Sequence, residues 1–413
     1  MGDEDIKKSI VLFAGEKLLC KAFSTSEASI RGLTSVEKMA CISVRIPLEF
    51  NPRTLRSQDL EKTLVEKHMR VCLSVDPGFE TAVTIAPSEP LLAQASFLLM
   101  KSPAFDLPRS LLSELEQSGL SKGDRGELIG MTLCLMARDA AAKKLDSQVI
   151  PVCDFIRELL VPSAHVLHSK PVQATTSSQA DKTFKDTFCK SNIFFSHFVK
   201  FRDHRVINRK YLWRLIARGA AGLCADYQYG LDIVIPFLYW DHTLQRRNVS
   251  AFFIQCKNNA TFLANPREYL FDMMNPYQIQ FFDKDEIDPV PVICMVFALA
   301  SPIADVVVLG RPERVQPPRD GAFKTKFQED QYTAFDIWCA KASHETFLPI
   351  KDDTVFTELL LRSSVFPNVY ERKKSNGLQN ATRSMNPGTD VHPAHWHFLE
   401  RKDGGSAPEM EIK

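Results

Sequence analysis

Residues 229–236 read YGLDIVIP, and they place a charged side chain where an apolar strand begins. A glycine turn precedes the carboxylate of Asp232, and an apolar run typical of a buried strand follows it. Burying that carboxylate without a partner would cost on the order of several kcal/mol. The sequence therefore predicts that Asp232 has a partner, a metal ion or solvent at the end of its strand.

A second predicted strand, residues 249–257, reads VSAFFIQCK and ends in polar groups. Because strand side chains alternate, Gln255 and Lys257 point to the same face. If the two strands are neighbours, the end that carries Asp232 meets the end that carries Lys257. One edge of the sheet would then present a carboxylate, an amide oxygen and an ammonium group.

This combination suits a metal-dependent phosphodiesterase. Magnesium prefers hard oxygen ligands, which the side chains of Asp232 and Gln255 and the backbone carbonyl of Cys256 could supply. Mg²⁺ or Mn²⁺ would acidify a water molecule and neutralise charge on the scissile phosphate. Lys257 would position that water or stabilise the developing charge.

A Gly-x-Asp turn followed by a strand that ends in Gln-x-Lys resembles the PD-(D/E)XK nuclease superfamily. The resemblance is to the Mrr-like restriction-endonuclease branch, where Gln replaces the usual acidic residue, and it covers Asn208–Leu309. Residues 198–259 also resemble a large uncharacterised family of fungal proteins. The nuclease resemblance implies a restriction-endonuclease-like α/β fold that hydrolyses DNA, with Asp232, Gln255 and Lys257 as catalytic residues.

The same resemblance implies an additional acidic ligand on the helix before the Asp strand, but the helix at 208–220 contains no acid. The best candidate is Glu127, far upstream in the helix that follows residue 123. Glu127 is either a catalytic metal ligand or a capping glutamate three residues after a candidate N-cap, Asp124. Asp226 either contributes to the site or is a turn residue.

Basic side chains indicate a nucleic-acid-binding face. Lys210, Arg214 and Arg218 recur at the spacing of one helical turn, and Arg246 and Arg247 lie in the loop between the two site strands. Phosphate contacts from such a face give non-specific affinity for nucleic acid. The alternative is an ordinary solvated helix face. The full basic run comprises Lys200, Arg202, Arg205, Arg209, Lys210, Arg214 and Arg218.

The fold expected from the hydrophobic pattern is a mixed central sheet flanked by helices, with a mostly helical N-terminal region. Helices are predicted at 58–72, 109–117, 125–144 and 208–220, and strands at 221–225, 231–239, 249–257, 290–300 and 304–309. The strands at 290–300 and 304–309 have the continuous apolar character of interior strands. The stretch 334–340 is interpreted as an edge strand.

The chain has 413 residues, 45% of them hydrophobic and 24% charged, which predicts a globular protein of two or three domains. The predicted parts are a helical scaffold or partner-binding region at 1–120, a nuclease-like core at 121–345 with a loop or insertion at about 166–186, a packing segment at 346–370, and a disordered tail at 371–413.

Charge and cysteine content exclude some classes. The net charge is +1, so no overall field draws the chain to nucleic acid or to an anionic membrane. The ten cysteines form no C-x-x-C motif and indicate reduced thiols in a reducing compartment, the nucleus or the cytoplasm. No apolar run approaches the roughly 18 residues of a membrane span.

Two other interpretations compete with a nuclease. The first is a catalytically inactive nuclease-like fold that binds protein or nucleic acid. The second is a structural core in which Asp232 and Lys257 form an ion pair, although such a pair contributes little net stability and gives Gln255 no role.

Overall fold

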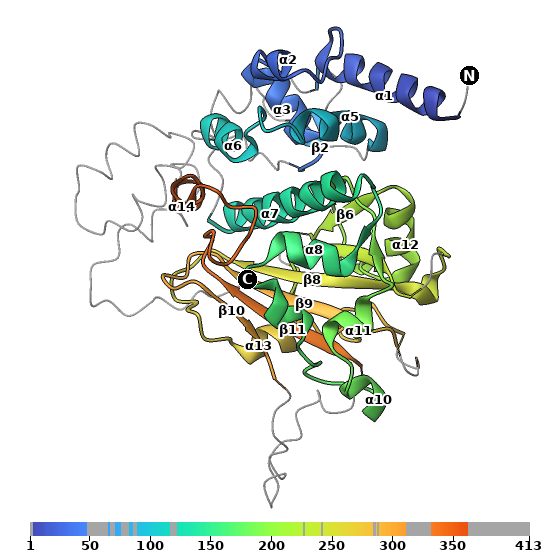
Figure 1. Ribbon diagram of the computed structural model, residues 1–413, viewed down its shortest axis with the longest axis vertical. Helices are drawn as coiled ribbons and strands as arrows, with labels where there is room; N and C mark the ends of the chain where they lie inside the picture. Colours follow the sequence, from blue (N-terminus) through green and yellow to red (C-terminus); the bar gives the residue numbers. More distant parts are fainter. Residues whose placement is uncertain are drawn as a thin grey trace, which may run out of the picture. The chain divides into compact units, whose positions relative to one another are not determined.

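The computed structural model describes residues 3–47, 65–66, 71–75, 82–85, 89–115, 122–225, 228–240, 243–283, 286, 289–310 and 332–361. These residues form a mixed α/β fold in which helices pack on a large mixed sheet (Figure 1). No helix in this part of the chain is long and apolar enough to cross a membrane. The tail predicted at 371–413 lies outside the described residues.

The N-terminal region is mostly helical, with a small two-stranded sheet. Its elements are α1 (Asp3–Leu19), α2 (Glu27–Arg31), α3 (Ser35–Ser43), β1 (Val71–Val75), β2 (Ala82–Ile85), α5 (Pro90–Met100) and α6 (Leu107–Leu115). The helix predicted at 58–72 is wrong at its end, because Val71 and Cys72 begin the strand β1. Residues 65–66 are helical, and the remainder of that predicted helix lies outside the described residues.

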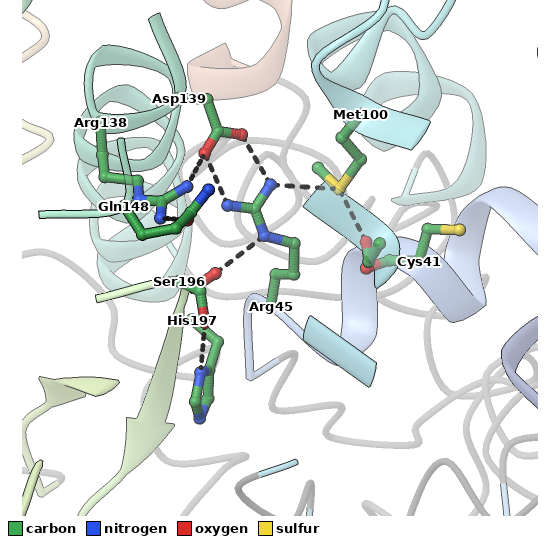
Figure 2. Close-up of polar contacts among 9 residues, drawn as sticks. Cys41, Arg45, Met100, Arg138, Asp139, Gln148, Ser196 and His197 are labelled. Carbon is green, nitrogen blue, oxygen red and sulfur yellow. Dashed lines mark hydrogen bonds and ion pairs between the residues drawn. The ribbon is translucent and has the colours of Figure 1, made fainter. Parts of the chain in front are cut away.

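A buried polar network ties the N-terminal helices to the sheet (Figure 2). The fully buried guanidinium of Arg45, just after α3, forms an ion pair with Asp139 at 2.6 Å and donates a 2.8 Å hydrogen bond to the Ser196 carbonyl. Arg138, also fully buried, holds the other oxygen of Asp139 at 3.0 Å. The Phe97 ring of α5 contacts both guanidinium groups. Burial in this arrangement is tolerated because the charges are paired and hydrogen-bonded.

The second half of the chain builds the large sheet. Its helices are α7 (Lys122–Leu145), α8 (Val152–Leu159), α9 (Ser163–Leu167), α10 (Ser177–Ala180), α11 (Phe184–Phe188), η1 (His204–Val206), α12 (Arg209–Ala217), η2 (Arg246–Asn248), α13 (Glu268–Asp272) and α14 (Asp353–Leu361). Its strands are β3 (Ile150–Pro151), β4 (Asn192–Ile193), β5 (His197–Lys200), β6 (Ala220–Leu223), β7 (Ile233–Leu238), β8 (Val249–Lys257), β9 (Val292–Ala298), β10 (Asp305–Val308) and β11 (Ala334–Ala340).

The strand order is β10-β11-β9-β8-β7, after which the sheet divides. β7 is antiparallel to β8, and β8, β9 and β11 are mutually parallel. The start of β7 pairs with β6, and its end pairs with β4. Pro236 lies between these two pairings, so its missing N–H falls where neither neighbour needs a donor.

The two faces of the sheet are covered by different helices. Ile233, Ile235 and Phe237 pack into the larger core, which α7 and α8 cover, and Figure 1 shows α7 and α8 lying across β8. Val234 and Phe253 pack on the opposite face with α12 and α13. Asn208 starts α12 by accepting a 3.0 Å hydrogen bond from the Tyr211 backbone N–H, the expected N-cap geometry.

Several predicted elements differ from the structure. The stretch 334–340 is a strand but not an edge strand, because β11 is fully buried between β9 and β10. The edge is β10, which was expected to be interior. The stretch 166–186, predicted as a loop or insertion, contains the end of α9, all of α10 and the start of α11, and Val172 donates a 2.9 Å backbone hydrogen bond to Ala334.

Candidate functional site

The ends of β7 and β8 meet at one edge of the sheet, as the sequence predicts. Asp232 immediately precedes β7, and its backbone N–H donates to the Ile254 carbonyl of β8 at 3.0 Å. Its carboxylate accepts a 2.6 Å hydrogen bond from the Cys256 backbone N–H. The Asp232 carboxylate therefore lies beside the last residues of β8. It accepts the Cys256 N–H in place of a backbone carbonyl of β7.

Gly230 makes the turn that leads into Asp232. Its φ of +76° lies in the left-handed region that glycine adopts without strain. A Cβ at this position would overlap the backbone carbonyl of Met273, which directly follows α13. The turn thus fixes the direction in which Asp232 enters β7.

Gln255 is buried, with 3% of its surface exposed, and among the described residues its Oε1 atom has no hydrogen-bond partner. The paired register of β7 and β8 ends at Ile233 and Ile254, and Gln255 is the next residue of β8. Leaving a buried amide oxygen without a partner costs about 1–3 kcal/mol. A native protein keeps such an atom where a water molecule, an ion or a ligand satisfies it.

Lys257 does not pair with Asp232. The described ion pairs include none between these two side chains, and the Lys257 ammonium lies 5.9 Å from the centre of the Phe262 ring. Its charge nevertheless lowers the pKa of Asp232. This arrangement disfavours a structural ion pair between Asp232 and Lys257. The Lys257 ammonium group lies beside the end of β8 instead.

Burial dominates the electrostatics of Asp232. Desolvation raises the pKa of this carboxyl, and the Cys256 hydrogen bond and the charges of Lys257 and Lys200 partly oppose that rise. The ionised form is therefore under-stabilised in the protein alone. A cation would favour it.

Glu127 is brought to the same strand end by close packing of α7 on β8. A Cβ on Gly126 would lie 3.2 Å from the Cβ of Asn258, and one on Gly130 would lie 2.5 Å from the Cys256 sulfur. These two glycines let the first turns of α7 approach the end of β8. After burial and Asp232, the charge of Glu127 is the next cause that raises the pKa of the Cys256 thiol.

Glu127 does not have the position of a capping glutamate. α7 begins at Lys122, so Asp124 lies in the first turn and is not the N-cap. A capping box needs the acid at the third helical residue, and Glu127 lies farther into the helix. Glu127 is therefore not a capping-box residue. Asp226 lies outside the described residues.

Lys200 is a member of this neighbourhood that the sequence assigned only to a basic surface. It ends β5, where it is aligned with Leu223 of β6. The Cys224 N–H donates to the Asp232 carbonyl at 2.7 Å, which brings the end of β6 to Asp232. The proximity of Lys200 to Asp232 follows from the pairing of β5 with β6, which the sequence alone does not show.

The predicted nucleic-acid residues are exposed. Lys210, Arg214 and Arg218 lie on the solvent face of α12, and Arg246 and Arg247 lie in η2, which packs against α12. Because β8 is nine residues long, η2 is at its far end, roughly 25 Å from Lys257. Arg209 is different, because it is largely buried and paired with Glu286. It is unavailable to a phosphate.

The site fits a hard divalent cation only in a limited way. Among the described residues, no three His, Cys, Asp or Glu side chains gather as a metal-binding group. Near this edge lie the carboxylate of Asp232, the acid Glu127 on α7, and the oxygen of Gln255, which has no hydrogen-bond partner in the described part of the chain. The backbone carbonyl of Cys256 faces the same side of β8 as its N–H, toward Asp232. All four are oxygen donors of the kind that Mg²⁺ and Mn²⁺ take.

A cavity of about 590 Å³ lies elsewhere, among the α5–α6 connection, the second half of α7 and α14. Its lining includes Met100, Met136, Asp139 and Phe356. It contains none of the predicted site residues, so the candidate site is the strand edge and not this cavity.

Comparison with known families places the chain. Residues 24–297 match the model of the domain of unknown function DUF8736, which covers more than half of the chain. The chain therefore belongs to the DUF8736 family. No curated protein and no solved structure matches it significantly. The matched region contains all four candidate catalytic residues, from Glu127 to Lys257.

Proposed function

We propose that this member of the DUF8736 family hydrolyses phosphodiester bonds in nucleic acid, with DNA as the expected substrate, at the edge formed by β7 and β8. The observation that carries the proposal is the strand end itself, where Asp232 accepts a hydrogen bond from the Cys256 N–H and the adjacent Gln255 has a buried amide oxygen with no hydrogen-bond partner among the described residues. In a native protein an oxygen of this kind is satisfied by a water molecule, an ion or a ligand, and we propose the ion.

We also propose that the core is restriction-endonuclease-like. The support is that the Asp-bearing strand β7 lies antiparallel to the Gln-x-Lys strand β8 within a mixed sheet. Helices cover both faces of that sheet, and the three motif residues occupy one edge. The resemblance to PD-(D/E)XK nucleases predicts this combination.

The oxygen donors support Mg²⁺ or Mn²⁺ as the ion, which Asp232, Gln255, the Cys256 carbonyl and Glu127 would hold. A bound divalent ion supplies Lewis-acid chemistry, acidifying water and neutralising phosphate charge. The protein's part is to keep Asp232 ionised and Gln255 oriented. The Cys256 N–H contributes to the first by hydrogen bonding, and burial restricts the Gln255 side chain for the second.

Lys257 and Lys200 supply positive charge on the two sides of Asp232. Lys257, at the end of β8, positions the attacking water or stabilises the charge that develops on the phosphate. Lys200 stabilises an adjacent phosphate. The exposed Lys210, Arg214 and Arg218 hold the flanking backbone without reading sequence.

The test is cleavage of supercoiled plasmid and of single-stranded DNA with Mg²⁺ or Mn²⁺. We expect the wild type to cut and Asp232→Asn and Lys257→Ala to lose at least a hundredfold in rate, with their folds retained by circular dichroism. Lys351→Ala is the matched control, because Lys351 is an exposed lysine that lines the separate 590 Å³ cavity, and it should cut normally.

The rival is an inactive nuclease-like fold that binds protein or nucleic acid. Clean wild-type protein that cuts neither substrate with either metal, yet binds DNA through the α12 face, would establish that rival. Equal cutting by the wild type and Asp232→Asn would show that any activity comes from elsewhere.

A further inference from the structure

Trp240 is an exposed aromatic residue in an unusual backbone conformation. It follows the end of β7, and 43% of its surface is exposed. Its φ of +55° lies in the left-handed region, which bulky side chains rarely adopt. Conformations of this kind persist where surrounding contacts hold them, and they are concentrated at functional sites.

Two contacts fix the Trp240 ring. Its indole N–H donates a 2.7 Å hydrogen bond to the Thr187 carbonyl at the end of α11. The Tyr239 ring lies against it with a centroid distance of 6.3 Å. The ring is thus oriented in advance although part of it faces solvent.

Positive charge surrounds this ring. The ammonium groups of Lys182 and Lys190 lie 5.7 Å and 5.0 Å from its centre. Arg246 and Arg247 are exposed on the other arm of the β7–β8 connection, which the Tyr239 N–H joins to the Asn248 carbonyl at 2.7 Å. The described part of this region presents one fixed aromatic surface and four basic side chains.

We propose that Trp240, with Lys182 and Lys190, is a stacking platform for an unpaired base of single-stranded nucleic acid. Proteins bind single strands by combining a basic surface for the phosphates with aromatic rings on which bases stack. A protein partner is the weaker fit, because apolar contacts would have to bury the surrounding lysines and arginines. The cations instead complement a chain of phosphates.

The platform is separate from the candidate catalytic edge. Six residues of β7 lie between Asp232 and Tyr239, which corresponds to roughly 20 Å along the strand. The inference rests on the proposed function only in sharing a nucleic-acid ligand. It adds that the bound strand reaches the far end of β7 and is at least locally unpaired there.

The experiment measures the affinity of the full chain for a fluorescein-labelled 20-nucleotide oligothymidine and for a 20-base-pair duplex by anisotropy, in EDTA. We expect Trp240→Ala to weaken oligothymidine binding about tenfold, and Trp240→Phe, which keeps a ring, to retain most of the affinity. Duplex binding should change little. Phe13→Ala, which removes an exposed ring from α1, is the control and should bind as the wild type does.

Replacing both lysines, as Lys182→Gln with Lys190→Gln, should reduce the salt dependence of oligothymidine binding by about 1.4 in log–log slope. Unchanged oligothymidine affinity of Trp240→Ala would overturn the platform, as would absence of any oligothymidine binding by the wild type. Equal weakening by Trp240→Ala and Trp240→Phe would also overturn the platform. Phenylalanine keeps a ring for stacking, so an equal effect would come from loss of the Thr187 hydrogen bond, which both variants lack. Because EDTA prevents cleavage, an inactive nuclease site leaves this result unaffected.

Discussion

Gln255 is the residue whose surroundings depart most from those of an ordinary core side chain. The alternation of strand residues predicted that it shares a face with Lys257. The sequence could not show that its buried amide oxygen lacks a partner within the described ranges, because that depends on which side chains β9 and α13 bring to the same face. Its isolation costs stability, and a cation would remove that cost.

Replacing Gln255 with leucine should therefore stabilise the metal-free protein while abolishing cleavage. Removing an unsatisfied buried oxygen in favour of an apolar group of similar size is worth about 1 kcal/mol. Urea denaturation measures the free energy of unfolding, and plasmid cutting measures the activity.

The matched control for this change is Ser191→Ala, which removes another buried oxygen without a partner, in the segment before β4. It should gain stability and keep activity. A Gln255→Leu protein that cuts DNA normally would remove Gln255 from the site.

Asp336 gives a prediction about pH. Burial in β11 raises the pKa of its carboxyl to about 7, with a smaller rise from Asp272. The folded state therefore binds the proton more tightly than the unfolded state, and stability falls as pH rises from about 4 to about 7, by ~4 kcal/mol at most.

Asp336→Asn is uncharged throughout this range, so the fall should be absent from its unfolding curves. Thermal denaturation of both proteins between pH 4 and pH 8 measures the difference. Identical pH dependence in the two proteins would mean that Asp336 does not control it.

The sequence predicted the helix α7 but not the strand against which it packs. The pattern near Glu127 predicted a helix, yet the predicted N-cap, Asp124, is already inside it. The glycines at 126 and 130 gave the only sequence signal for close packing, since they remove side chains from one face of the helix. What they pack against could not be predicted, because β8 follows more than a hundred residues later.

Gly130→Ala should push α7 away from β8 and lower both stability and cleavage. Its new Cβ would lie 2.5 Å from the Cys256 sulfur and 3.0 Å from Ile233, and overpacking of this kind costs about 1–3 kcal/mol. Combining it with Cys256→Ala should recover part of the loss, measured as a double-mutant cycle by urea denaturation.

Gly310→Ala is the control for this cycle, because a Cβ there meets no atom within 4 Å, and it should be neutral. Additive effects of Gly130→Ala and Cys256→Ala would show that the two positions are not in contact.

The hydrophobic pattern predicted the bounds of individual strands but not their order in the sheet. The bounds predicted for β8 and β11 agree with the structure, because their apolar runs end at polar residues. The order of strands could not be predicted from the runs themselves. β10 and β11 are both apolar, and only pairing with β9 made β11 interior and left β10 at the edge.

Attachment of the N-terminal helices to the sheet depends on a network with two buried guanidinium groups and one carboxylate. No local pattern in the sequence links Arg45 to Asp139 and Ser196, since the three belong to distant segments (Figure 2). Because Asp139 forms ion pairs with both arginines, its loss should destabilise the network more than the loss of either arginine.

Asp139→Asn should thus destabilise the protein by about 3–5 kcal/mol, since it leaves two buried cations without a counter-charge. Arg45→Met should cost less, because the pair of Arg138 with Asp139 remains. Urea denaturation of both variants gives the comparison, and a milder effect of Asp139→Asn would contradict this view of the network.

Binding of Mn²⁺ to the whole chain, followed by isothermal titration calorimetry, needs no knowledge of the natural substrate and addresses the proposed metal site itself. We predict that the wild type binds Mn²⁺, that Asp232→Asn does not, and that wild-type affinity weakens as pH falls toward the raised pKa of Asp232, because the ion and the proton compete for the same carboxylate. Equal Mn²⁺ binding by the wild type and Asp232→Asn, or none by either, would contradict the assignment of a metal-dependent nuclease site to the β7–β8 edge.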